Sequence, residues 1–283
     1  MKIVVAVDGS KYGTWAVEWS RRLALQKSER VTAVHVVDVG AFAAPLVPVP
    51  MPAWDAPYIK KETARLEAHA RSVVKETKRL LARFDSGGRV VVEHGAAASK
   101  ILDHAKSAGT LIALGSRGLS ALDRFMLGSV STKVVHHAAG PVLVVKQPPR
   151  PIRKILLATD GSKASDKALQ FLLHHYRAQA GHGAACEVAV LHAMPLLRYP
   201  ELKESGHVLV NRAGAQLEAV GYRVEPVLKI GHPAEEILKF ADRRKIDLIV
   251  TGARGRGVLA RFLLGSVSTK LVQYSRVSNL IVR

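Results

Sequence analysis

One glycine pattern occurs twice in this chain and constrains its fold more than any other feature. The spacing Gly, two residues, Gly, nine residues, Gly-Ser runs from Gly115 to Ser129 and again from Gly252 to Ser266. Each copy follows an apolar run and precedes a helix-like segment. A glycine-rich turn between a strand and a helix N-terminus presents several backbone N–H groups to a phosphate. The sequence therefore predicts a pair of nucleotide sites.

The repeat extends well beyond these loops. The segment KIVVAVDGSK at Lys2–Lys11 returns as KILLATDGSK at Lys154–Lys163, and GSVSTK occurs unchanged at 128–133 and 265–270. A period this long indicates duplicated domains, because the repeats of solenoid proteins run to about 20–50 residues.

The boundary between the copies is marked by the sequence QPPRP at Gln147–Pro151, which continues neither a helix nor a sheet. We expect a first domain at 1–146, a linker at 147–152 and a second domain at 153–283. Each copy is close to the commonest domain size and is long enough to bury its own core.

Each half contains five short apolar runs separated by helical patterns. Runs without alternation are typical of strands buried on both faces, and their alternation with helices indicates an α/β fold with a parallel sheet. We expect five strands and four helices per half, with helices on both faces of each open sheet. The expected strands are Ile3–Val7, Val31–Val37, Val90–Val92, Leu111–Leu114, Val142–Val145, Lys154–Thr159, Glu187–His192, Arg223–Leu228, Leu248–Thr251 and Leu280–Val282.

The net charge of +19 is the unusual feature of the composition. Such a charge attracts nucleic acid, anionic membranes and nucleotide phosphates. However, the Lys and Arg residues are scattered with interspersed Glu, and aromatic residues make up only 5% of the chain, too few for an obvious base-stacking platform. We interpret the charge as a solvated basic surface, with no specific nucleic-acid role.

Cys186 is the only cysteine, so no internal disulfide is expected and a reducing compartment fits. It precedes an apolar run, which favours a buried, inert thiol. The sequence has no apolar run of about 20 residues and no signal-peptide pattern at its start, so we expect a cytoplasmic protein without a membrane role.

In an open parallel sheet, ligands bind beyond the carboxyl ends of the strands, where the winding reverses. Asp8 and Asp160 stand at the ends of the first strands, and Gly115 and Gly252 at the ends of the fourth. If these strands are neighbours, each carboxylate faces its glycine loop, where it could accept a ribose or adenine hydrogen bond or help to hold a metal. The alternative is that Asp-Gly-Ser only caps the following helix.

The loops contain further candidates for phosphate contact. Ser129 and Ser266 could be plain helix N-caps, or could add a hydroxyl contact to a phosphate. A guanidinium near phosphate is expected chemistry, although these side chains could equally face solvent. The loop arginines are Arg117, Arg124, Arg254 and Arg261.

Taken together, these motifs resemble the universal stress protein family in its tandem two-domain form. The resemblance rests on VAVDGS and LATDGS at the first strand ends, VHVVD at the second, GHPAEEI in the second half, and both glycine loops. It covers essentially the whole chain and implies two doubly wound domains of the adenine nucleotide alpha hydrolase-like fold. Within that family the glycine loop marks the ATP-binding branch.

The resemblance implies two sites for ATP, with Mg, and assigns no catalytic or protein metal-ligating residue. The family's adenine contact falls on Val36 and Ala193, and the smaller Ala193 is expected to loosen the second pocket. With the loop arginines included, the first site would comprise Asp8, Val36, Gly115, Arg117, Gly118, Gly128, Ser129 and Val130. The second would comprise Asp160, Ala193, Gly252, Arg254, Gly255, Gly265, Ser266 and Val267.

The sequence departs from its own repeat at the Pro-rich stretch 44–57, which has no counterpart in the second half. It could be a lid over the first site, a partner-binding segment or an ordinary surface excursion.

The leading hypothesis is an ATP-binding stress-response regulator whose nucleotide occupancy sets its conformation or an unidentified protein partner. The family's final strands pair across a two-fold axis, which implies an intrachain pseudo-dimer and allows a homodimer. A slow ATPase or phosphotransferase is the first alternative, but the sequence has no Walker or kinase motif. A nucleic-acid or anionic-surface binder driven by charge is the second.

Overall fold

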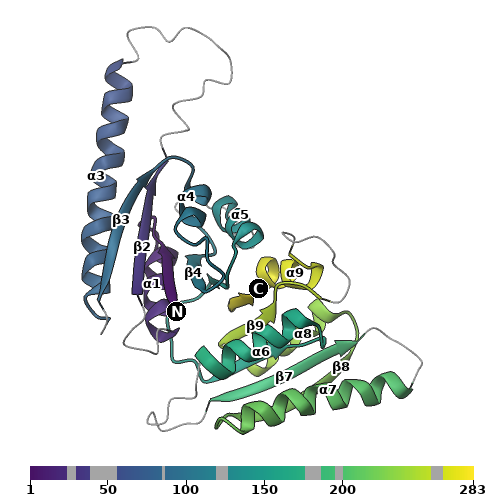
Figure 1. The fold of residues 1–283 in the computed structure, drawn as a ribbon. Helices are drawn as coiled ribbons and strands as arrows, with labels where there is room; N and C mark the ends of the chain where they lie inside the picture. The colour runs from purple at the N-terminus through teal and green to yellow at the C-terminus, as the bar shows by residue number, and fades with distance from the viewer. Residues whose placement is uncertain are drawn as a thin grey trace, which may run out of the picture.

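The computed structural model describes residues 1–23, 30–38, 56–84, 87–118, 127–175, 186–194, 200–255 and 264–283. Strands and helices alternate along the chain, and Figure 1 shows their arrangement in two halves. The first half comprises β1 (Lys2–Ala6), α1 (Lys11–Leu23), β2 (Arg30–Val37), α3 (Ala56–Leu81), β3 (Gly88–His94), α4 (Ala97–Asp103), β4 (Thr110–Gly115), α5 (Ser129–His137) and β5 (Val142–Val145).

The second half repeats this order of elements within its described residues. It comprises β6 (Lys154–Ala158), α6 (Lys163–His175), β7 (Glu187–Met194), α7 (Pro200–Glu218), β8 (Arg223–Ile230), α8 (Pro233–Arg244), β9 (Leu248–Gly252), α9 (Ser266–Tyr274) and β10 (Ser278–Val282).

The ten strands form one sheet in the order β3-β2-β1-β4-β5-β10-β9-β6-β7-β8. Within each half all pairs are parallel, and the order reverses between β1 and β4 and between β6 and β9, which confirms the expected doubly wound fold. The two halves meet where β5 and β10 pair antiparallel, with Leu280 opposite Leu143. The pairing of final strands that the resemblance implied is therefore present within the chain.

Helices cover both faces of this sheet. One continuous apolar cluster joins the strands to α1, α3, α6 and α7, and it includes the fully buried Trp19 of α1. On the other face, α4 and α5 pack in the first half, and α8 and α9 in the second. The central strands are buried on both faces, which explains why their sequences are continuous apolar runs.

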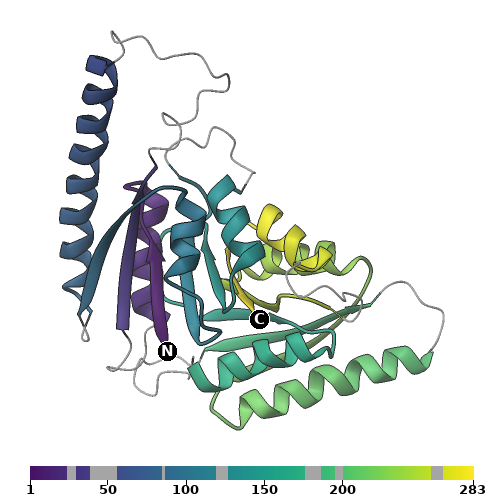
Figure 2. The same cartoon turned by 45° about the horizontal axis from the view of Figure 1, so that its top comes forward.

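The outer strands β3 and β8 differ from this expectation. Both are only partly buried along their length, and the Val92 side chain of β3 is 40% exposed. Both are edge strands at the ends of the sheet, and exposed and partly buried positions are mixed along each of them without strict alternation. The helix that follows the second strand of each half, α3 or α7, lies along this outer edge in both views (Figure 1 and Figure 2).

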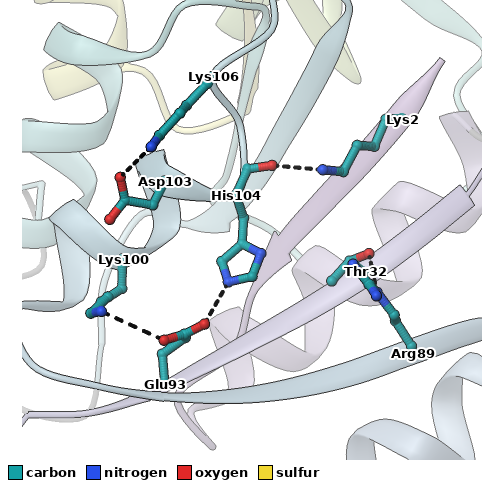
Figure 3. A network of polar contacts seen from close by, with 8 residues as sticks. All are labelled: Lys2, Thr32, Arg89, Glu93, Lys100, Asp103, His104 and Lys106. Carbon is teal, nitrogen blue, oxygen red and sulfur yellow. Dashed lines mark hydrogen bonds and ion pairs between the residues drawn. The ribbon is translucent and has the colours of Figure 1, made fainter.

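A polar network fixes α4 against the sheet (Figure 3). His104, at the end of α4, places Nε2 2.9 Å from Glu93 of β3, whose other oxygen lies 3.6 Å from Lys100 Nζ. The hydrogen bond from His104 is the main cause that lowers the pKa of Glu93. Lys2 Nζ donates to the His104 carbonyl at 2.9 Å, so β1, β3 and α4 are tied together.

Two further expectations concern the single cysteine and membrane-spanning segments. The Cys186 thiol is buried as predicted, and this burial raises its pKa to about 12, which disfavours the reactive thiolate. In the described part of the chain no helix combines the length and apolarity that crossing a membrane requires.

Two cations cross the seam between the halves in a reciprocal arrangement. Lys146, just after β5, donates from Nζ to the carbonyls of Gln273 at 3.2 Å and Ser275 at 2.7 Å, at the C-terminal end of α9. Arg283, just after β10, donates from Nη2 to the carbonyls of Val135 and His136 in α5. Each half thus places a cation on the last carbonyls of the other half's helix, where the helix dipole favours positive charge.

The position of Lys146 also has an electrostatic cost. Burial, followed by repulsion from Arg117, lowers the pKa of Lys146 to about 8 from its ordinary value of 10.5. Between these two pH values the unfolded chain binds more protons at this group than the folded chain does. Stability from Lys146 is therefore fully present above pH 10.5 and is lost as the pH falls through about 8.

We predict that Lys146→Met removes this pH dependence. The free energy of unfolding of the wild type should rise relative to that of the variant between pH 8 and 10.5, by up to about 3 kcal/mol. Urea unfolding at closely spaced pH values measures the difference, and Lys239→Met on the exposed face of α8 is the control. A wild-type curve parallel to that of Lys146→Met would contradict the assignment.

Candidate nucleotide site

A cavity of about 390 Å³ lies at the carboxyl ends of β1, β2 and β4, beside the start of α5. It lies where the strand order reverses, the position at which open α/β sheets bind ligands. All eight residues expected for the first site line it: Asp8, Val36, Gly115, Arg117, Gly118, Gly128, Ser129 and Val130.

The orientation of the Asp8 carboxylate is set by the following turn. Its Oδ1 accepts from the backbone N–H of Ser10 at 3.0 Å and from the Ser10 hydroxyl at 2.7 Å. The Ser10 Oγ in turn accepts from the N–H of Gly13 at 3.1 Å, so Ser10 caps α1. Asp8 therefore supports the cap of α1 by holding Ser10 and does not cap the helix itself. Its other oxygen, Oδ2, faces the glycine loop.

The glycines of the loop allow the chain to approach this carboxylate. A Cβ on Gly118 would lie 2.7 Å from Asp8 Oδ2, and one on Gly115 would lie 2.5 Å from the Cβ of Tyr12. Real Cβ atoms essentially never make contacts this short. At Gly115 glycine is therefore required by the close packing of the β4 end on the start of α1, independently of any ligand, whereas at Gly118 the close neighbour is the end of the Asp8 side chain, which can move.

The N-cap interpretation of the loop serine is wrong. The N-cap of α5 is Gly128, with no side-chain cap hydrogen bond, and Ser129 is the first helical residue. The same holds for Gly265 and Ser266 in α9. A helix start without a capping side chain leaves its first N–H groups available to an anion.

Arg117 lies at the rim of the first cavity. Its Nη1 donates to the Tyr12 hydroxyl at 3.1 Å, and its guanidinium lies 5.6 Å from the centre of the Tyr12 ring. Its Nε is buried and has no partner among the described residues. The contact with Tyr12 thus holds the Arg117 guanidinium beside the cavity, in contrast to a freely solvated arginine.

Two histidines support the β1 end from behind. His35 Nδ1 donates to the Val7 carbonyl at 2.8 Å, and His69 Nε2 of α3 donates to the Asp8 carbonyl at 3.0 Å. Burial is the main cause that lowers the pKa of His35, so a neutral ring is favoured. These residues position the backbone next to Asp8 without lining the cavity.

Sequence reasoning missed several residues of the site. The Ser131 hydroxyl donates to the Gly115 carbonyl at 2.8 Å and holds the loop to α5; the repeated GSVSTK sequence was the signal for it. The other missed lining residues are Ala6, Val7 and Gly13 near Asp8, and a set of apolar residues, called here the apolar wall, that no motif marks. The apolar wall comprises Val34, Ala97, Ile101, Leu114 and Leu127.

The second half repeats the same backbone framework. A Cβ on Gly255 would lie 2.7 Å from Asp160 Oδ2, and Ser268 donates to the Gly252 carbonyl at 2.8 Å, as their counterparts do in the first half. Asp160 Oδ1 also accepts from the N–H of Ser162 at 3.0 Å.

The second set of expected residues does not share one described cavity. Arg254 and Gly255 line a cavity of about 610 Å³ that faces the start of α6. Ala193 is buried in the core, and Val267 packs against that core partly buried. The remaining members, Asp160, Gly252, Gly265 and Ser266, do not line the 610 Å³ cavity.

Some of the expected features lie outside the described residues. These are the loop arginines Arg124 and Arg261 and residues 44–55 of the Pro-rich stretch.

Comparisons with known proteins agree with the resemblance noted from the motifs. The sequence profile of the universal stress protein family matches residues 1–146 and 151–283. A universal stress protein of Mycolicibacterium smegmatis is 30% identical over 301 residues, covering 99% of this chain and 96% of the relative. One from Mycobacterium tuberculosis is 28% identical, covering 99% of this chain and 94% of the relative.

The fold also matches a solved structure over its full length. A universal stress protein from Archaeoglobus fulgidus aligns with a TM-score of 0.70 and 20% identity, covering 100% of this chain and 98% of that one. At this level of identity the match supports the arrangement of both halves and says nothing of ligands.

We predict that Ser10→Ala destabilises the protein more than Ser162→Ala does. Ser10 makes short hydrogen bonds to Asp8 and Gly13, whereas the matching contacts of Ser162 Oγ, to Arg254 and Ser165, measure 3.4 and 3.3 Å. We expect losses of about 1–2 kcal/mol for Ser10→Ala and under about 1 kcal/mol for Ser162→Ala. Urea unfolding measures both, and equal losses would contradict the asymmetry.

Proposed function

Because this chain belongs to the universal stress protein family, we propose that it is an ATP-binding regulator whose nucleotide occupancy controls its conformation or partners. The observation that supports this best is the first cavity, which is lined by every residue expected for the first site. Its position at the strand reversal and its lining by glycines, one carboxylate and one guanidinium fit a nucleotide.

The lining divides into parts that match the parts of ATP. The apolar wall, with Val36, suits an adenine ring, and Asp8 offers an acceptor oxygen to a ribose hydroxyl. The start of α5, uncapped by any side chain, suits phosphate oxygens, and Arg117 adds positive charge. The cavity of about 390 Å³ is within the usual range for small-molecule pockets.

Magnesium fits this proposal as a companion of the phosphates. Bound Mg²⁺ neutralises phosphate charge and usually keeps several waters, with few protein ligands. Asp8, the carboxylate among the described lining residues, is assigned above to the ribose, so the phosphates and water would hold the metal.

We propose a nucleotide in the second half as well. The support is the shared framework, in which Gly255 approaches Asp160 as Gly118 approaches Asp8. The uncapped start of α9 provides the same N–H groups as that of α5.

A regulatory role is supported by what α5 contacts. Its start borders the first cavity, and the carbonyls of Val135 and His136 near its other end accept from Arg283 of the second half. Figure 1 and Figure 2 both place α5 beside α9 at the junction. A ligand that favours one position of α5 would therefore act directly on the contact between the halves.

We predict that Gly118→Val removes one nucleotide per chain. The new Cβ would displace the Asp8 carboxylate, the mobile end of a side chain, so the variant should fold while its first site is distorted. Bound ATP should fall from about two to about one per chain in Gly118→Val and in Gly255→Val, and to none in the double variant. Equilibrium dialysis with Mg-ATP measures this.

Gly109→Val is the matched control, because a Cβ there meets nothing closer than Ser107 Oγ at 3.7 Å. Its ATP content should equal that of the wild type. Full ATP binding by the double variant would rule out these loops as nucleotide sites.

A further inference from the structure

The two halves differ at the start of their first helices. In the first half, Tyr12 and Trp15 of α1 pack edge to face, with ring centres 5.0 Å apart. Lys11 Nζ lies 5.4 and 5.6 Å from these two ring centres, and Arg117 bonds the Tyr12 hydroxyl. Aromatic rings thus cover this face of the first glycine loop.

The repeat replaces both rings in the second half. The repeated segments at Lys2–Lys11 and Lys154–Lys163 align Tyr12 with Ala164 and Trp15 with Lys167. With the rings gone, a cavity of about 610 Å³ lies over the second glycine loop. Two changes in one helical turn therefore exchange an aromatic cover for open, positively charged space.

Four cations from three parts of the chain line this cavity. Lys163 and Lys167 come from α6, Arg254 from the loop after β9, and Arg283 follows β10. The lining also includes the Gly161-Ser162 turn at the start of α6 and Gly255, and no carboxylate is among its described residues. Within the described part of the chain neither lysine has a carboxylate within 4 Å.

Arg283 is held in this position by the seam. Its Nη2 is engaged by the α5 carbonyls, while its Nε is buried without a partner among the described residues. Burial, followed by repulsion from Arg254, lowers the pKa of Arg283. Fixed positive charge that lines a cavity is the environment in which a multiply charged anion is stabilised.

We propose that this cavity binds an oligophosphate group, a chain of two or more phosphoryl units. The cations come from α6, from the glycine loop and from the chain end, and a chain of phosphoryl units offers anionic oxygens to all three parts. The group could be a free oligophosphate, or the terminal phosphates of a nucleotide held by the second glycine loop. Only the second source rests on the function proposed above.

Isothermal titration calorimetry with inorganic tripolyphosphate tests this on the full chain. In the variant Ala164→Tyr/Lys167→Trp, which copies the first half, affinity should fall by about tenfold or more because the cavity is filled and one charge is lost. The single surface variant Lys167→Gln should lose about three- to tenfold without any demand on packing. Thermal unfolding checks that both variants fold.

Lys11→Gln is the matched control, since Lys11 is the counterpart of Lys163 and lies over aromatic rings. It should bind tripolyphosphate as the wild type does, whereas Lys163→Gln should be weakened. Equal losses in Lys11→Gln and Lys163→Gln would show binding to the basic surface in general and would overturn the proposal.

Parallel titrations with adenosine and ATP distinguish the two sources. Tripolyphosphate binding unchanged by saturating ATP indicates a free oligophosphate site separate from any bound nucleotide. If tripolyphosphate fails to bind, but the filled variant loses ATP affinity and keeps adenosine affinity, the cavity holds nucleotide phosphates. Failure of both overturns the proposal. Tripolyphosphate binding without any ATP binding would overturn only the nucleotide function.

Discussion

The antiparallel contact between β5 and β10 is the constraint on which the rest of this structure depends. It joins two five-stranded sheets into one and buries what would otherwise be two apolar sheet edges, as shown by the full burial of Leu143 and Leu280. It also sets Lys146 and Arg283 on the helix ends of the opposite half. Each cation reaches the carbonyls of the opposite half only because the two strands pair. The strand pairing and the two polar contacts therefore support one another.

Much of the fold could be predicted from the sequence because its signals are local. Continuous apolar runs marked the central strands, and the duplicated motifs gave the order of elements in both halves. What the runs could not show was which strands lie at edges: Val92 belongs to an apolar run, yet it is 40% exposed because β3 has a neighbour on one side only. Edge position depends on long-range pairing, which no window of sequence contains.

In the candidate site, too, the features with a local sequence signal were predictable and those set by long-range packing were not. The glycine positions and Asp8 were predictable because a close backbone approach favours glycine at fixed positions in the sequence. The structure shows such an approach, since a Cβ on Gly118 would lie 2.7 Å from Asp8 Oδ2. The apolar wall was not predictable, since Ile101 and Leu127 are ordinary apolar residues whose role depends on where α4 and the loop are placed. The serine cap was assigned one residue too late, because Gly-Ser does not reveal which residue begins the helix.

Charge connects the seam to both glycine loops. Repulsion from Arg117 contributes to the lowered pKa of Lys146, and repulsion from Arg254 contributes to that of Arg283. Each seam cation is therefore held near a loop arginine as well as on the opposite helix end, although the two repel. The hydrogen bonds to helix carbonyls oppose that repulsion, and any negative charge placed at a loop would oppose it further. The pairs Lys146–Arg117 and Arg283–Arg254 therefore link the binding of an anion at either loop to the contact between the halves.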